Sequence, residues 1–181
     1  MAKHYGQEPE NAVQFNFDEE EFGAVQRVMV RFFTSALWTD LDKYCVRYFG
    51  GSMSTKLTSL AKEMPHQSTL VLETIGSMTG QMRSCALPYV IDEGRYCVVG
   101  SRAGGPIDPA WVLNLRRNPA CWAWINRKHV PCRAEEATGE VRQRVIDFIR
   151  DNYTDMIDEY QRTAAPRIIP IMMLTPCKQY Q

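Results

Sequence analysis

Hydrophobic residues recur with two different periods along this chain. Up to about residue 66 they follow helical spacing, and from Ser68 onward apolar and polar positions alternate. The helical part predicts a first helix that begins at a capping box formed by Asp18 and Glu21 and continues to Ala36. A second helix is expected over Leu41–Tyr48, where two glycines follow and end it.

Two more signals complete the N-terminal part. Thr39 and Asp40 could cap the second helix, and Ser54–Glu63 predicts a third, short helix before a proline. We therefore expect residues 1–66 to form a helical extension that packs on a domain made of residues 67–181.

The alternating half of the chain predicts six strands and two inserted helices. One helix, Pro109–Arg117, carries a proline in its first turn and Asp108 as a candidate cap, and Glu140–Asn152 forms a longer amphipathic helix. Six mostly antiparallel strands with helical insertions predict an α+β fold, mainly β, built on a small closed barrel. The strands are expected at Thr69–Ile75, Arg83–Ile91, Arg95–Ser101, Ala120–Asn126, His129–Ala137 and Ile168–Leu174.

Composition narrows the range of partners. The chain has 181 residues, of which 45% are hydrophobic, with 21 basic and 21 acidic side chains. Nucleic acid is not expected as the main partner, because phosphate binding needs a basic excess or a concentrated basic face. No apolar run reaches spanning length and no secretory signal is evident, so we expect a cytoplasmic protein. Arg27 and Arg31 lie beside aromatic residues, which leaves peripheral contact with a membrane open.

Cysteine and histidine give little support for a metal site. The six cysteines form no Cys-x-x-Cys pair, and the chain has three histidines. We expect no metal, and we interpret the cysteines as reduced thiols.

Three segments lie after strands or at the start of a helix: the polar, glycine-bearing Gly76–Arg83 and Ser101–Gly105, and Pro109–Leu115. Loops that alternate with strands in this way bring several chain segments to one small-molecule site. Backbone N–H groups of the first loop and the guanidinium of Arg83 could hold a phosphate, whereas an ordinary hairpin with a solvated arginine is the alternative.

The segment from Thr69 to Pro176 resembles the deazaflavin-dependent nitroreductase family, within the flavin and deazaflavin oxidoreductases of the split β-barrel fold. The resemblance implies a six-stranded split β-barrel that uses the deazaflavin coenzyme F420, with FMN as the second choice. It rests on the Thr-x-Gly-x-x-Thr-Gly-x-x-Arg pattern at Thr74–Arg83, on Leu87-Pro88-Tyr89, on Ser101–Gly105, on Pro109–Pro119, and on Tyr160-Gln161, Arg167 and Ile169-Pro170.

The resemblance also implies which residues form the site. Trp111 and Asn114 lie three apart on a helix and share a face, which suits a packing group and an amide directed at the coenzyme, although the tryptophan could equally belong to the core. Tyrosines near the last strand would line the substrate pocket or simply pack with their hydroxyl groups in water. The expected coenzyme-binding residues are Gly76, Thr79, Gly80, Arg83, Arg102, Gly104, Ala110, Trp111 and Asn114, and the expected catalytic residues are Ser101, Tyr153 and Tyr160.

The first loop departs from the family pattern. Where relatives carry Gly-Arg-Lys-Ser/Thr-Gly, this chain has Ser77-Met78, so two cations expected beside the anionic tail of the coenzyme are absent. The leading hypothesis is an oxidoreductase that transfers hydride from reduced deazaflavin or flavin to a quinone, enone or nitroaromatic compound. The altered loop keeps two alternatives open. One is a hydrolase or lyase acting on an aromatic or nitro compound, and the other is a non-catalytic binder of a flavin, tetrapyrrole or fatty acid.

Oligomeric state is the last open point. Strand residues Trp122 and Trp124 could bury a homodimer interface, or the N-terminal helices could cover the same strand.

Overall fold

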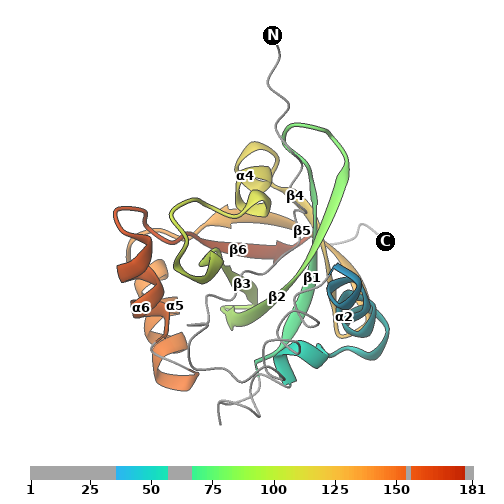
Figure 1. Cartoon of the computed structure of the whole chain (residues 1–181), viewed down its shortest axis with the longest axis horizontal. Helices are drawn as coiled ribbons and strands as arrows, with labels where there is room; N and C mark the ends of the chain where they lie inside the picture. The colour runs from blue at the N-terminus through green and yellow to red at the C-terminus, as the bar shows by residue number, and fades with distance from the viewer. Residues whose placement is uncertain (1–35, 57–66, 154–155, 178–181) are drawn as a thin grey trace, which may run out of the picture.

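Six antiparallel strands close into a barrel in the computed structural model, which describes residues 36–56, 67–153 and 156–177 (Figure 1). The strand order around the barrel is β1-β2-β3-β6-β5-β4, and β1 pairs with β4 to close it. The α+β barrel expected from the alternating half is confirmed. The strands are β1 (Thr69–Ile75), β2 (Met82–Asp92), β3 (Arg95–Val99), β4 (Ala120–Ile125), β5 (Lys128–Glu136) and β6 (Ile171–Pro176).

Strand β4 shows how the alternating pattern maps onto the barrel wall. Cys121, Ala123 and Ile125 are buried inside, whereas Trp122 and Trp124 lie on the outer face and are partly exposed. Successive side chains of a strand point to opposite faces, so a period of two in the sequence becomes an inside and an outside in the structure.

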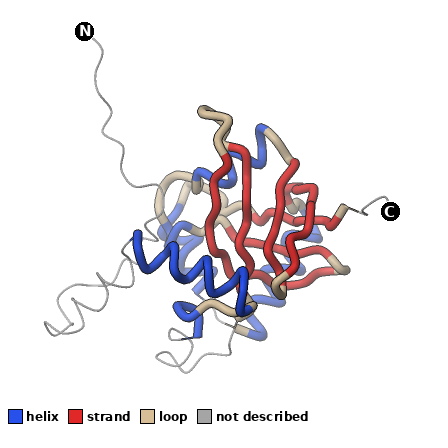
Figure 2. The backbone as a smooth tube through the Cα atoms, turned by 90° about the vertical axis from the view of Figure 1, so that its right-hand side faces the viewer, coloured by secondary structure: helices blue, strands red, loops and turns tan. Residues whose placement is uncertain are grey.

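Helix α2 (Ala36–Phe49) covers part of the outer wall and packs on β1 and β4. Figure 2 shows it crossing the strands on the face turned toward the viewer. The helix ends where the sequence predicts, but the expected cap is wrong because Thr39 and Asp40 lie within the helix. The carboxylate of Asp40 instead forms an ion pair with Lys43 at 2.8 Å, one turn further along.

The carboxylate of Glu73 fastens α2 to the barrel. Glu73 projects from β1 with 14% of its side chain exposed, and it accepts hydrogen bonds from Arg47 Nη2 (2.7 Å) and Trp124 Nε1 (3.2 Å). Its other oxygen lies 2.9 Å from His129 Nε2, and the ring of His129 stacks on Trp124. The sequence left open whether a homodimer partner or the N-terminal helices cover Trp122 and Trp124. At Trp124, the structure shows that α2 does so.

Two further helices, α5 (Gly139–Asn152) and α6 (Met156–Ala164), lie on the opposite side of the barrel from α2 (Figure 1). Helix α4 (Ala110–Arg117) precedes them in the sequence and packs on β1 and β5. The helical insertions over Pro109–Arg117 and Glu140–Asn152 are therefore confirmed, whereas α6 has no counterpart in the strand and helix pattern read from the sequence.

Strand β6 begins three residues later than the expected Ile168. Two groups of the preceding backbone bond to the side chain of Gln161: its Nε2 donates to the carbonyl of Arg167 (2.6 Å), and the amide of Ile169 donates to its Oε1 (2.9 Å). Because these groups are already satisfied, the segment does not join the sheet until Ile171.

Several expectations fall outside the described residues. The first helix, from Asp18 to Ala36, lies there apart from its last residue, and so does most of the third, of which residues 53–56 are described as helical. The division of the chain at residues 66 and 67 also stays a prediction. None of the described helices is long and apolar enough to cross a membrane.

We expect packing inside the barrel to stabilise the fold, and a substitution of Leu72 can test this. Its side chain is fully buried in the main core cluster. We expect Leu72→Ala to lower the free energy of unfolding by about 2–5 kcal/mol, because the change removes buried methylene groups and leaves a cavity. Leu113→Ala is the matched control, since Leu113 is 49% exposed on α4, and it should change stability by less than about 0.5 kcal/mol. Urea unfolding measures both, and equal losses would contradict this assignment.

Candidate functional site

The loop between β1 and β2 is closed on itself by a tight turn. The amide of Gly76 donates to the carbonyl of Gln81, and the amide of Gly80 donates to the carbonyl of Gly76, both at 2.8 Å. A Cβ at Gly76 would lie 2.9 Å from Thr79 Oγ1 and 3.1 Å from the carbonyl oxygen of Gln81, so a larger residue there would require the turn to shift. The turn presents Met78, which is 96% exposed, at the position where the family carries a cation.

The side chain of Asn114 joins this loop to α4. Asn114 is 6% exposed; its Nδ2 donates to Thr74 Oγ1 (3.1 Å), and its Oδ1 accepts the amide of Ser77 (2.8 Å). Both ends of the amide are thus used within the protein. This geometry shows that Asn114 supports the loop, and its expected contact with the coenzyme stays a prediction.

The second loop follows β3 and forms a short turn, η1 (Arg102–Gly104). Arg102, Ala103 and Gly104 all have positive φ angles, of 48°, 49° and 76°. Two of the three are not glycine, and such left-handed residues cost free energy unless their surroundings fix them. Helix α6 lies close to Gly104, because a Cβ there would be only 3.0 Å from the Cβ of Thr163.

Arg167 supplies most of the remaining support for this loop. Its guanidinium is 10% exposed and donates to the carbonyl oxygens of Gly100 (3.0 Å), Ser101 (2.7 Å) and Gly105 (3.0 Å). It also pairs with Asp108 at 2.8 Å. One cation therefore holds the whole turn from the end of β3 to the start of α4.

Asp108 does not act as the helix cap that the sequence suggested. The residue at the cap position is Pro109, and no side-chain capping bond is present there. The carboxylate of Asp108 instead pairs with Arg167 and Arg116, and Arg116 also binds Glu136 through two bonds of 2.8 Å. A carboxylate forms stronger hydrogen bonds with a guanidinium than with a helix amide, so Asp108 pairs with the two arginines and does not cap the helix.

The candidate residues fall into two connected groups. Asn114 connects α4 to the Gly76–Arg83 loop, and the Asp108–Arg167 pair connects the start of α4 to the Ser101–Gly105 loop. Helix α4 therefore links both loops. Ala110 lies exposed in the first turn of this helix, and Trp111, 9% exposed, is part of the core.

The two candidate tyrosines occupy different surroundings. Tyr160 lies on α6, where its carbonyl is 3.3 Å from the position a Cβ of Gly104 would take. Burial raises the pKa of its hydroxyl, which keeps the phenol protonated at neutral pH. Tyr153 packs at the end of α5 against Phe148, with ring centroids 6.2 Å apart. Tyr160 is thus adjacent to the second loop, and Tyr153 belongs to the cluster beneath α5.

The structure adds residues that the sequence reasoning did not assign. Arg167 and Gln161 were noticed only as parts of a family pattern, yet they hold the second loop and the entry to β6. Their acceptors are mostly backbone carbonyls, which leave no mark in a sequence. The one signal in the sequence was Arg167 itself, a charged residue just before the apolar run that leads into β6.

The buried cysteines, Cys121 and Cys132 in the barrel core and Cys97 in the cluster beneath α5, contribute no reactive centre. Burial raises the pKa of Cys121 to about 12 and the pKa of Cys97 and Cys132 to about 11. All the cysteines in the described ranges are free thiols, and Cys177 is exposed. Within the described ranges, no three His, Cys, Asp or Glu side chains gather in a way that could hold a metal ion.

Comparison with known proteins decides the family. The family model for F420H(2)-dependent quinone reductases matches residues 46–176, which include both loops, α4 and every strand. The chain belongs to the F420H(2)-dependent quinone reductase family. An F420H(2)-dependent quinone reductase of Mycobacterium tuberculosis (strain ATCC 25618 / H37Rv) is 31% identical over 110 residues, covering 59% of this chain and 72% of the relative.

Solved structures agree with this family assignment. A structure described as an F420-H2 dependent reductase is 29% identical, with a TM-score of 0.52, and covers 59% of this chain and 92% of that chain. A second, described as a domain-swapped dimer, has the same identity and TM-score and covers 78% of that chain. Members of the F420H(2)-dependent quinone reductase family are oxidoreductases that use a deazaflavin coenzyme, and this chain has their split β-barrel fold.

The contacts of Asn114 make a testable prediction. Asn114→Ala leaves Thr74 Oγ1 and the amide of Ser77 without their partner, so we expect the free energy of unfolding to fall by about 1–3 kcal/mol. Amide hydrogen exchange of residues 76–81 should accelerate. Asn118→Ala is the control, since Asn118 caps an exposed turn with a 3.1 Å bond to the amide of Ala120. Unchanged exchange in the loop would show that Asn114 does not hold it.

Proposed function

We propose that the two loops and the first turn of α4 together bind reduced coenzyme F420, and that the protein transfers its hydride to a quinone. The observation that carries this proposal is the double attachment of α4, through Asn114 to the first loop and through Asp108 and Arg167 to the second. A rigid common support for two loops suits a reaction in which two ligands must be aligned.

The residues fit a phosphate and a flat ring in different places. Gly76, Thr79 and Gly80 lie in the tight turn and Arg83 lies at the start of β2, and we assign them to the phosphate side of the coenzyme. Arg102 and Gly104 belong to the second loop, Ala110 and Trp111 belong to the first turn of α4, and we assign these four to the ring. Bound F420 would supply the hydride and the electron pair that it carries. Asn114 would position the first loop instead of touching the coenzyme.

Quinone reduction also needs stabilisation of a developing negative charge. Hydride addition leaves an oxyanion on the former quinone, and one proton completes the hydroquinone. Tyr160 is the better candidate for this step, because its backbone lies beside Gly104 of the second loop and burial raises the pKa of its phenol, which stays protonated. The hydroxyl of Ser101 would be a second donor. Tyr153 stays a weaker prediction, since its ring packs beneath α5.

Turnover and binding test the proposed function directly. We expect the purified protein to bind F420 with a Kd of tens of micromolar or tighter, and to oxidise reduced F420 when a quinone such as menadione is added. Fluorescence titration and the absorbance of the coenzyme provide the two measurements. FMN should bind more weakly. Tighter FMN binding, or turnover of an aromatic ester or nitro compound without reduced F420, would contradict the proposal and favour one of the alternatives.

The altered first loop makes a prediction specific to this chain. The double variant Ser77→Arg with Met78→Lys restores the cation pair of the family, and we expect it to bind F420 about tenfold more tightly, since exposed charges contribute less than buried ones. The gain should shrink at high salt because the interaction is screened. Ser77→Gln with Met78→Gln is the neutral control. An equal gain in that control would mean that charge is not what the loop lacks.

The remaining expectations concern assembly and location. A solved relative is described as a domain-swapped dimer, and we infer that this chain also forms a homodimer. Trp122 on β4 is available to such an interface, whereas Trp124 is covered by α2. A cytoplasmic location, peripheral membrane contact and the lack of nucleic-acid binding stay predictions from the sequence.

A further inference from the structure

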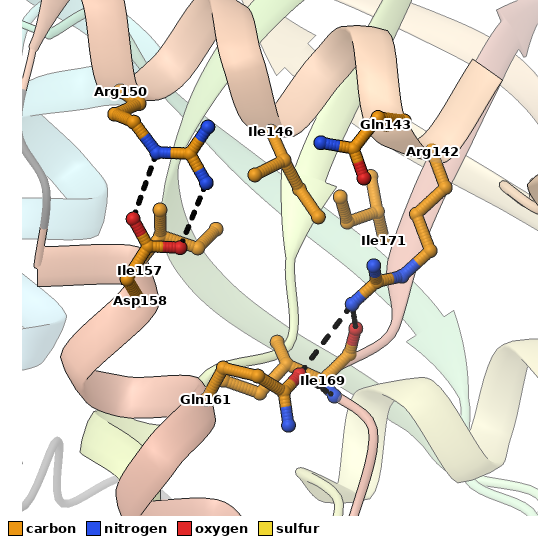
Figure 3. A pocket seen from close by; sticks show the side chains of 9 residues that line it. All are labelled: Arg142, Gln143, Ile146, Arg150, Ile157, Asp158, Gln161, Ile169 and Ile171. Carbon is orange, nitrogen blue, oxygen red and sulfur yellow. Dashed lines mark hydrogen bonds and ion pairs between the residues drawn. The ribbon is translucent and has the colours of Figure 1, made fainter. Parts of the chain in front are cut away.

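A cavity of about 180 Å³ opens between α5 and α6, away from the two loops (Figure 3). This volume is well above the roughly 10–15 Å³ that one water molecule requires. Its apolar wall consists of Ile146 and Ile157 from the helices and Ile169 and Ile171 from β6 and its approach, all nearly or fully buried. Arg142 lies at one end.

Arg142 lacks a full set of partners. Its Nη2 donates to the carbonyl of Ile169 (3.2 Å) and makes a long bond to Gln161 Oε1 (3.4 Å), and its Nε is shielded from solvent without any hydrogen-bond partner. The amide of Gln161 is already engaged, because it binds Ile169 and Arg167 at 2.9 and 2.6 Å. A buried donor without a partner costs free energy.

The other arginines of α5 show what Arg142 is missing. Arg144 pairs with Asp92 at 2.8 Å, and Arg150 pairs with Asp147 and Asp158, both at 2.7 Å. Among the described residues, no carboxylate lies within ion-pair distance of Arg142. Arg150 and Asp158 pair with each other at the far end of the cavity, so, among the lining residues that the structure describes, Arg142 is the one charged side chain without an oppositely charged partner.

We propose that this cavity, which we call the α5–α6 cavity, binds a small monocarboxylate with a short branched aliphatic chain. The carboxylate would give the guanidinium of Arg142 its missing partner through charge-assisted hydrogen bonds, after a small rotation that brings Nε toward the ligand. The aliphatic chain would lie against the four isoleucines. Water alone would satisfy the donor but would leave the positive charge uncompensated.

This inference does not depend on the proposed reaction. The α5–α6 cavity shares none of its lining residues with the assigned coenzyme contacts. The titration is therefore done without F420, and its failure would leave the coenzyme assignment untouched. Gln161 lines the cavity and also holds the carbonyl of Arg167, so an occupied cavity adjoins the support of the second loop.

Isovalerate and isovaleramide provide the test on the unaltered protein. Both have the same branched chain, but only isovalerate carries a charge. At constant ionic strength, we expect isovalerate to bind saturably with a Kd on the order of 1 mM, and isovaleramide to bind at least about tenfold more weakly. Two-dimensional NMR should place the shift changes on α5 and α6. Equal binding of the two compounds, no saturation, or shift changes elsewhere would overturn the proposal.

Variants on α5 separate charge from packing. Arg142→Gln should weaken isovalerate binding by about tenfold or more, whereas Arg144→Gln, which removes a charge already paired with Asp92, should leave the Kd unchanged. Ile146→Phe should abolish binding by filling the cavity while Arg142 remains. If Arg142→Gln does not fold, Ile146→Phe and the comparison of acid with amide decide the question. Unchanged binding in Ile146→Phe would overturn the proposed location.

Discussion

The guanidinium of Arg167 is the contact on which the candidate site most depends. It is nearly buried, and its charge is compensated by Asp108 and by three backbone carbonyls of the turn after β3. A planar group with five donors in fixed directions defines the positions of its acceptors, which a lysine could not do. The turn contains two non-glycine residues in the left-handed region, and this cation provides the fixed surroundings that such a backbone requires.

Helix α4 turns these local contacts into one arrangement. Asp108 lies just before the helix and Asn114 lies on its buried face, so the two loops move only if the helix moves. The helix in turn packs on β1 and β5, which belong to the closed barrel. The placement of the two loops is thus tied to the barrel core. At Ser77-Met78, where the sequence departs from the expected pattern, Met78 is exposed and Ser77 bonds to Asn114 through its backbone amide, so neither side chain makes the bonds of this framework.

Most of the fold could be predicted from the sequence, because the alternation of Trp122 and Trp124 with buried neighbours records which face of a strand is inside. The pairing of β1 with β4 could not, since a period of two marks faces and not partners. Within the site, the loops and their glycines were visible as a pattern. The partners of Asp108 and Asn114 were not, because a carboxylate or amide can serve a helix end, an arginine or a ligand equally well. Only the folded chain places Arg167 beside Asp108.

The buried thiols have a consequence for a protein of a quinone-reducing family. Quinones are electrophiles that arylate thiolates, and only the ionised form of cysteine attacks them readily. With pKa values near 11 to 12, Cys97, Cys121 and Cys132 are ionised at neutral pH in about one molecule in ten thousand or fewer. The two buried clusters can therefore contain these three cysteines without becoming a target of the oxidant class that the family consumes. Any covalent adduct would form preferentially at the exposed Cys177, outside the core.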